Sequence, residues 1–135
     1  LHSFRESDQK ILFVRGVINE DNFSSNNPNI TVYNYLYGER LEEALNSSRL
    51  IISRSGYTTL MDLAKLEKKA FFIPTPGQFE QEYLAARMTK LGIAASCSQE
   101  DFTPSLLKNS EDFYGLSDPG FTCSFSGLFS LFEGK

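Results

Sequence analysis

Two short polar stretches carry the side chains with the clearest chemical potential. The first, Ser55-Gly56-Tyr57-Thr58-Thr59, follows an apolar run and opens a segment with helical spacing. A helix start behind a glycine offers main-chain N–H groups and the positive end of the helix dipole to an anion. This stretch is therefore a candidate anion site, in which Thr58 or Thr59 hydrogen-bonds a phosphate and Gly56 supplies a sharp turn and space for the ligand. An ordinary turn capped by its own hydroxyls is the alternative, and the pattern alone leaves both open.

Asp62 favours the anion-binding interpretation. It lies four residues after Thr58 and three after Thr59, hence on the same helix face one turn further in. A carboxylate there can accept two hydrogen bonds from a ribose diol, as the acidic residue of dinucleotide-binding folds does. We expect Asp62 to bind ribose, and a solvated aspartate near a helix start is the alternative.

The second polar stretch combines amide and carboxylate groups ahead of Tyr83. Its members are Gln78, Glu80, Gln81 and Glu82. Such a cluster suits the several hydroxyls of a sugar, because amides and carboxylates together donate and accept hydrogen bonds. A solvated helix start, where acidic residues are common, is the competing interpretation, and the residues alone favour it.

Both stretches follow apolar runs that are typical of strands. The run 50–52 is rich in β-branched residues and fits a strand buried on both faces, and the run 70–73 is stopped by Pro74 and Pro76. Segments 57–65 and 79–91 have helical spacing. Such a βαβα unit pairs its strands in parallel and binds ligands at their carboxyl ends. The turns 53–58 and 75–81 lie at that edge, so topology alone predicts a site there.

The flanking sequence predicts further elements of the same kind. Strands are expected at 11–14, 30–35 and 93–97, and a helix at 39–46. Gly92 is well placed to cap the helix before it, and Thr103 with Pro104 to start a last helix. The phenylalanine-rich segment 109–135 is either a terminal helix or a tail that packs on another domain.

Composition narrows the classes of function. The chain has 135 residues, enough for one domain with a core, and its net charge of −4 comes without any basic run. This argues against binding nucleic acid or an anionic membrane surface, but not against one anionic small molecule. The sequence has no stretch that could span a membrane and no signal peptide.

The cysteines and the single histidine exclude several kinds of chemistry. Cys97 and Cys123 form no CxxC motif, and Cys97 ends an apolar run, which predicts a buried reduced thiol and a cytoplasmic protein. His2 stands alone near the amino terminus. A histidine-based zinc site or a Ser-His-Asp triad is therefore not expected.

The segment from Ser53 to Ala86 resembles the C-terminal domain of family 28-type, MurG-like glycosyltransferases. Its sequence is SRSGYTTLMDLAKLEKKAFFIPTPGQFEQEYLAA. The shared pattern is a Ser-Gly turn, a helix with an acidic residue, a Phe-x-Pro strand end and a Gln-rich segment before an aromatic residue. The match covers roughly residues 34–98, and two separate motifs occur at the right separation.

The resemblance implies an α/β fold, namely a Rossmann-like three-layer domain with a mostly parallel sheet. This domain is the C-terminal half of the GT-B architecture and binds a nucleotide-sugar, usually a UDP-sugar, while the other domain holds the acceptor and usually the catalytic base. We expect residues 1–108 to be this domain and 109–135 a tail or terminal helix. By the resemblance Ser55 to Thr59 would face the diphosphate, Asp62 the ribose, and Gln78, Gln81 and Glu82 the sugar.

Three departures from the family pattern bear on these expectations. The ribose acid is often Glu, one methylene longer than Asp62, and Glu82 stands where Gln is frequent, which affects the sugar preferred. The glycine-rich phosphate loop of the family follows a first strand, whereas Ile11–Val14 looks like the second strand. Since the chain opens on Leu1, we expect a fragment without that first strand and without the acceptor domain.

The function implied is nucleotide-sugar binding in a transferase that moves a hexose or N-acetylhexosamine to an acceptor hydroxyl. The acceptor would displace the diphosphate directly, usually with inversion, after losing a proton to a base of the other domain. Within the chain we expect no catalytic residue, no cofactor and no metal site, so the fragment alone would be inactive. Its partners would be the UDP-sugar and the N-terminal domain, through which the protein would contact a membrane.

Two other functions stay open. A UDP-sugar hydrolase of the same fold would use water in place of the acceptor. A Rossmann-like binding module without chemistry is a different class, and nucleotide-sugar turnover by the full-length protein would separate it from the enzymes. A flavodoxin-type module is disfavoured, because Arg15-Gly16-Val17-Ile18 offers no phosphate-binding hydroxyls after its strand.

Overall fold

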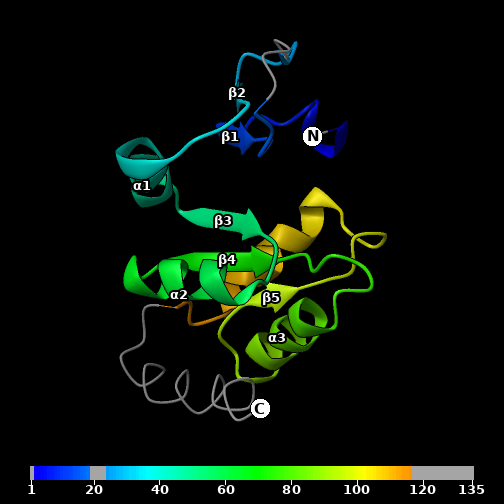
Figure 1. Ribbon diagram of the computed structural model, residues 1–135. Coiled ribbons are helices and arrows are strands. Elements are labelled where there is room, and N and C mark those ends of the chain that lie inside the picture. Colours follow the sequence, from blue (N-terminus) through cyan, green and yellow to red (C-terminus); the bar gives the residue numbers. More distant parts are fainter. Residues whose placement is uncertain (1, 19–23, 117–135) are drawn as a thin grey trace. The chain divides into compact units, whose positions relative to one another are not determined.

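The computed structural model describes residues 2–18 and 24–116 of the chain. The chain divides into two compact units, with the boundary between Ser48 and Arg49, and each unit is described by itself (Figure 1). The predictions for Cys123 and for most of the phenylalanine-rich segment lie outside the described residues. The predicted domain limits, 1–108 and 109–135, stay predictions.

The first unit contains two parallel strands and one α-helix. β1 (Ile11–Val14) pairs with β2 (Ile30–Tyr33), with Ile11 opposite Ile30. A short 3-10 helix, η1 (His2–Phe4), precedes β1, and α1 (Gly38–Ser47) follows β2. The predicted strand 30–35 therefore ends at Tyr33, while the predicted helix 39–46 is confirmed with one more residue at each end.

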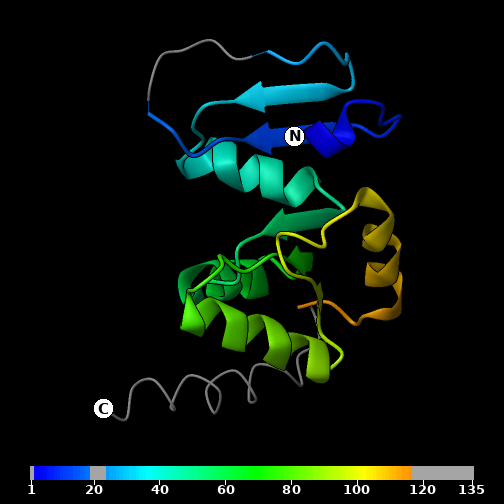
Figure 2. The ribbon, with the colours of Figure 1, turned by 90° about the vertical axis from the view of Figure 1, so that its right-hand side faces the viewer.

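The second unit is a parallel sheet with helices on both sides. Its strands, in the order β3-β4-β5, are β3 (Leu50–Ser53), β4 (Lys69–Phe72) and β5 (Ala95–Ser96). α2 (Tyr57–Lys65) joins β3 to β4, and α3 (Phe79–Lys90) joins β4 to β5. A 3-10 helix, η2 (Pro104–Asp112), follows β5. Figure 2 shows α2 and α3 on one side of the sheet and η2 on the other. The predicted parallel βαβα unit is confirmed.

The core of this unit is built on β4. Its large apolar side chains come from β4, α2 and α3, and those at most 2% exposed include Phe71, Phe72, Leu60, Leu63, Leu84 and Met88. Full burial of one such side chain stabilises a fold by about 1.5–3 kcal/mol. The core thus packs α2 and α3 against β4.

Two strand predictions were wrong in part. β3 is an edge strand of its sheet, and it is not buried on both faces, because Ile52 is 39% exposed. β5 is shorter than the predicted strand 93–97, because the chain leaves α3 through Gly92 at a φ of +73° and the N–H groups of Ile93 and Ala94 bond to the carbonyl of Met88. Those two residues therefore close the helix instead of pairing in the sheet.

The helix predicted to start at Thr103 and Pro104 is present as the 3-10 helix η2, with Thr103 at the N-cap position and Pro104 as its first residue. The hydroxyl of Thr103 makes no capping hydrogen bond and instead lies 2.9 Å from that of Ser105. In the described ranges, no helix is long and apolar enough to cross a membrane.

Candidate functional site

The carboxyl ends of the three strands of the second unit lie side by side. The N–H of Ile73 bonds to the carbonyl of Ser53 at 2.9 Å, and the N–H of Cys97 bonds to that of Phe72 at 3.2 Å, so the ladder continues past the strands. The turn from β3 to α2 and the loop from β4 to α3 begin at this edge. Both predicted polar stretches are therefore brought to one edge of one sheet, where α/β proteins bind ligands.

α2 begins at this edge without a side-chain cap. Its N-cap residue is Gly56, which has no side chain and therefore makes no capping hydrogen bond. Thr58 and Thr59 lie inside α2, after its N-cap residue. The positive end of the helix dipole at the start of α2 therefore lies at the carboxyl edge of the sheet, where it favours an anion.

Gly56 does not serve the turn in the way the sequence suggested. Its φ of −73° is open to any residue, so the turn does not require glycine. What glycine supplies is space, because no described heavy atom lies within 4 Å of the position that a Cβ would take. The backbone at the start of α2 can thus be approached closely from outside.

Ser55 has a different role from the one predicted for it. Its side chain is fully buried, and its hydroxyl donates a hydrogen bond of 2.6 Å to the main-chain carbonyl of Gln81 in α3. The hydroxyl is thus committed to joining the two turns of the edge. Only the main chain of Ser55 is then available to contact an anion.

Asp62 and Thr58 lie on α2 as expected. Both are exposed, and they are four residues apart on the helix, so they share one face. Thr59 is half-buried. The helix start and an accessible carboxylate one turn further in are therefore both available to a ligand.

Gln81 and Glu82 support the loop from β4 to α3. The Oε1 atom of Gln81 accepts a hydrogen bond from the N–H of Thr75 at 2.8 Å, and the Oε1 atom of Glu82 accepts one from the N–H of Gly77 at 3.1 Å. These bonds do not use the amide nitrogen of Gln81 or the second carboxylate oxygen of Glu82. Gln78, at the N-cap of α3, and Glu80 are exposed.

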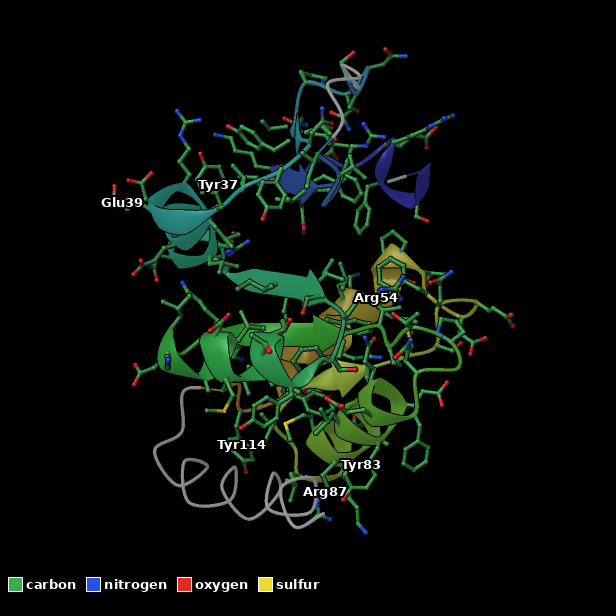
Figure 3. The ribbon with its side chains drawn as sticks, viewed as in Figure 1. Tyr37, Glu39, Arg54, Tyr83, Arg87 and Tyr114 are labelled. Atoms are coloured by element: carbon green, nitrogen blue, oxygen red, sulfur yellow. The ribbon has the colours of Figure 1, made fainter. Side chains whose placement is uncertain are left out.

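Arg54 is a residue of this edge that the sequence analysis did not single out. It precedes Ser55, and its guanidinium donates to the carbonyls of Ile73 and Pro74 and to the side chain of Gln99. Figure 3 shows Arg54 at the end of β3. An arginine in a turn is common, and only the fold reveals that its side chain crosses the sheet edge.

The first unit has a hollow of its own that the sequence analysis also missed. Its volume is about 440 Å³, and its lining residues are Tyr33, Tyr35, Leu36, Tyr37, Gly38, Glu39 and Arg40. The rings of Tyr35 and Tyr37 lie 5.8 Å apart, and Tyr37 is 74% exposed. Exposed rings of this kind suit stacking against a flat group. The tyrosines at every second position from 33 to 37 were the sequence signal that could have revealed this hollow.

Cys97 follows β5 at the carboxyl edge of the second unit. It is only partly buried, so the prediction of a buried cysteine was wrong, and among the described residues it forms no disulfide. Partial burial of the thiol and, to a smaller extent, the negative charge of Asp101 raise the pKa of Cys97. The described residues contain no group of three or more His, Cys, Asp or Glu side chains that could hold a metal ion.

Comparison with solved structures defines the class of fold. The chain is similar to the crystal structure of the glycotransferase of kitacinnamycin, with a TM-score of 0.63 over 94% of this chain and 32% of that chain, at 20% sequence identity. At this identity the likeness shows the fold alone. The predicted α/β, Rossmann-like fold is confirmed.

The sequence defines the family. Residues 3–112 match the glycosyltransferase family 28 C-terminal domain. The chain therefore belongs to this family, and the resemblance inferred from the two motifs is confirmed.

The curated relatives described here carry the same name. The chain is 36% identical over 69 residues to the UDP-N-acetylglucosamine–N-acetylmuramyl-(pentapeptide) pyrophosphoryl-undecaprenol N-acetylglucosamine transferase of Methylobacterium radiotolerans, covering 50% of this chain and 19% of the relative. The transferases of the same name from Rhodopseudomonas palustris and Haemophilus influenzae are 38% and 34% identical over 69 and 88 residues, which are 50% and 56% of this chain. The chain thus spans 19% to 25% of the length of these relatives.

Proposed function

We propose that this chain is the nucleotide-sugar-binding part of a glycosyltransferase that uses a UDP-sugar. The observation that carries the proposal is the uncapped start of α2 beside the open space at Gly56, at the carboxyl edge of a parallel sheet. A diphosphate fits such a place, because main-chain N–H groups and the helix dipole stabilise its negative charge. The uridine part of the proposal rests on the relatives, whose names specify UDP-N-acetylglucosamine.

The remaining parts of the ligand follow from the positions along α2 and α3. Asp62, exposed one turn into α2, would accept hydrogen bonds from the ribose hydroxyls. Gln78, the amide nitrogen of Gln81 and the second carboxylate oxygen of Glu82 would contact the sugar. A hexose or an N-acetylhexosamine would both suit this mixture of amide and carboxylate groups.

In the proposed reaction an acceptor hydroxyl attacks the anomeric carbon, and the bond from that carbon to the diphosphate oxygen breaks. The negative charge that develops on the leaving diphosphate is stabilised by the N–H groups at the start of α2. The base that removes the acceptor proton comes from outside this chain. The chain alone would therefore bind nucleotide without transferring sugar.

Calorimetric titration of the 135-residue chain with UDP and with ADP tests the proposal. We expect saturable binding of UDP that is tighter than binding of ADP. Asp62→Asn removes a charged hydrogen-bond acceptor and should raise the Kd for UDP by about tenfold. Asp112→Asn is the matched control, because Asp112 is also exposed in the second unit but lies in η2, and it should leave the Kd unchanged.

Two results would contradict the proposal. One is the absence of saturable UDP binding. The other is an equal loss of affinity in the Asp62 and Asp112 variants, which would mean that net charge, and not a ribose contact, governs binding. Incubation with UDP-sugars should release no UDP, and release of UDP by the chain alone would favour the hydrolase instead.

A further inference from the structure

The side chain of Arg54 bridges the ends of all three strands in the second unit. Its Nη1 donates hydrogen bonds to the carbonyls of Ile73, at 3.0 Å, and Pro74, at 3.2 Å, just after β4. Its Nη2 donates to Oε1 of Gln99, at 2.7 Å, beyond β5. Arg54 itself follows β3 directly. One planar group thus holds three chain segments at the edge where the ligand is proposed to bind.

These bonds act on the loop that carries the sugar-facing residues. Pro74 is where the chain leaves β4, and the carbonyls of Ile73 and Pro74 are fixed by the guanidinium. The next residue, Thr75, donates its N–H to the side chain of Gln81. The start of the loop is therefore held by Arg54 and its end by Gln81.

A fifth hydrogen bond closes the arrangement into a ring. The hydroxyl of Ser55, the residue after Arg54, donates to the carbonyl of Gln81. The ring runs from Arg54 to Pro74, along the chain to Thr75, across to Gln81, and back through Ser55. The start of α2 and the start of α3 are thus bound to each other by side chains from two consecutive residues.

We propose that Arg54 is a positioning residue that sets the separation between the diphosphate-binding turn and the sugar-facing loop. This inference rests on the proposed function and adds to it a residue that touches neither part of the ligand. Its three acceptors are uncharged, so the bonds depend on the geometry of the guanidinium and not on ion pairing. A lysine cannot replace it, because a single ammonium lacks the two separate nitrogens that reach the carbonyls after β4 and the side chain of Gln99.

UDP and a UDP-sugar share the same nucleotide, but their binding should respond differently to the loss of Arg54. UDP reaches only the α2 side of the ring, whereas a UDP-sugar also needs the loop at its correct distance. Loss of Arg54 should therefore weaken UDP-sugar binding much more than UDP binding. A general loss of structure would weaken both alike.

The test uses Arg54→Gln and Arg54→Lys in the 135-residue chain, with Arg49→Gln as the matched control. Arg49 is an exposed arginine just before β3, at the opposite end of the same strand, so its loss changes the net charge equally. UDP is titrated beside UDP-glucose, UDP-galactose and UDP-N-acetylglucosamine, and the UDP-sugar that the wild type binds most tightly is taken forward. Amide hydrogen exchange is measured on each variant without ligand.

We expect both Arg54 variants to keep the Kd for UDP within about twofold and to raise the Kd for the UDP-sugar about tenfold, because the sugar-facing loop is no longer held at its distance from the start of α2. The amides of Thr75 and Gln78 should exchange faster in both variants. Arg49→Gln should change none of these quantities.

Several outcomes would overturn the inference. An equal rise in both Kd values would mean that the variant has lost structure in general or that Arg54 acts on the diphosphate by its charge. Full recovery of UDP-sugar binding by Arg54→Lys would mean that the charge of Arg54, and not its geometry, is what matters. Unchanged binding and exchange would mean that Arg54 is dispensable. If the wild type binds neither ligand, the proposed function fails first, and the positioning role fails with it.

Discussion

The hydroxyl of Ser55 donates a hydrogen bond of 2.6 Å to the main-chain carbonyl of Gln81, and this bond joins the first turn after β3 to the first turn of α3. Ser55 is fully buried, so water does not compete for the bond. The two segments that the sequence marks as polar are therefore parts of one structure.

Ser55→Ala should lower the free energy of unfolding. The substitution removes a buried hydrogen bond, which typically contributes about 1 kcal/mol. Urea denaturation followed by circular dichroism measures the change. The control is Ser53→Ala, because the hydroxyl of Ser53 bonds only to the neighbouring carbonyl of Arg54, at 3.1 Å. Equal stability of the Ser55 variant and the wild type would show that the bond does not join the two turns in solution.

Gly56→Ala should weaken UDP binding, whereas Gly77→Ala should lower stability. Gly56 has an ordinary φ of −73° and open space around it, so alanine should preserve stability while its Cβ fills the space proposed for the diphosphate and weakens UDP binding. Gly77 has a φ of +80°, so alanine there should lower the free energy of unfolding by about 1–2 kcal/mol. Urea denaturation and UDP titration of both variants separate the effects. Destabilisation by Gly56→Ala would refute the assignment of this glycine to ligand access.

Cys97 should react slowly with alkylating reagents at neutral pH. Burial and the Asp101 carboxylate raise the pKa of Cys97, so the reactive thiolate is scarce. Asp101→Asn removes the repelling charge, which should lower this pKa part of the way and speed alkylation. The rate of iodoacetamide labelling across pH 7–10 shows this, with peptide mass mapping to separate Cys97 from Cys123. Glu100→Gln, an exposed neighbour, should leave the rate unchanged. A faster reaction in both variants would point to net charge instead.

The sequence was sufficient to predict the elements from β3 to α3. Apolar runs ended by Ser53 and by Pro74 predicted the strands, and helical spacing predicted both helices. Parallel pairing followed from the order of the elements. The prediction of β5 was too long because residues 93 and 94 are apolar like a strand. In the fold, however, the N–H groups of Ile93 and Ala94 close α3 by bonding to the carbonyl of Met88, and local sequence does not show this.

The functions of individual polar side chains could not be predicted equally well. Ser55 was expected to face the ligand, yet its hydroxyl is taken by a carbonyl that lies 26 residues further along the chain. The same applies to Arg54, whose partners follow β4 and β5. Such contacts depend on which strand ends become neighbours, and residue type and local spacing do not contain that information.

The most direct test of the account is an NMR titration of the isotope-labelled chain with UDP, in which each amide is followed separately. The account predicts saturable shifts that are largest at the amides of residues 56–59, at the start of α2, with smaller shifts near Asp62. Absence of saturable shifts at these amides, or shifts confined to other parts of the chain, would contradict the assignment of a nucleotide site to this edge of the sheet.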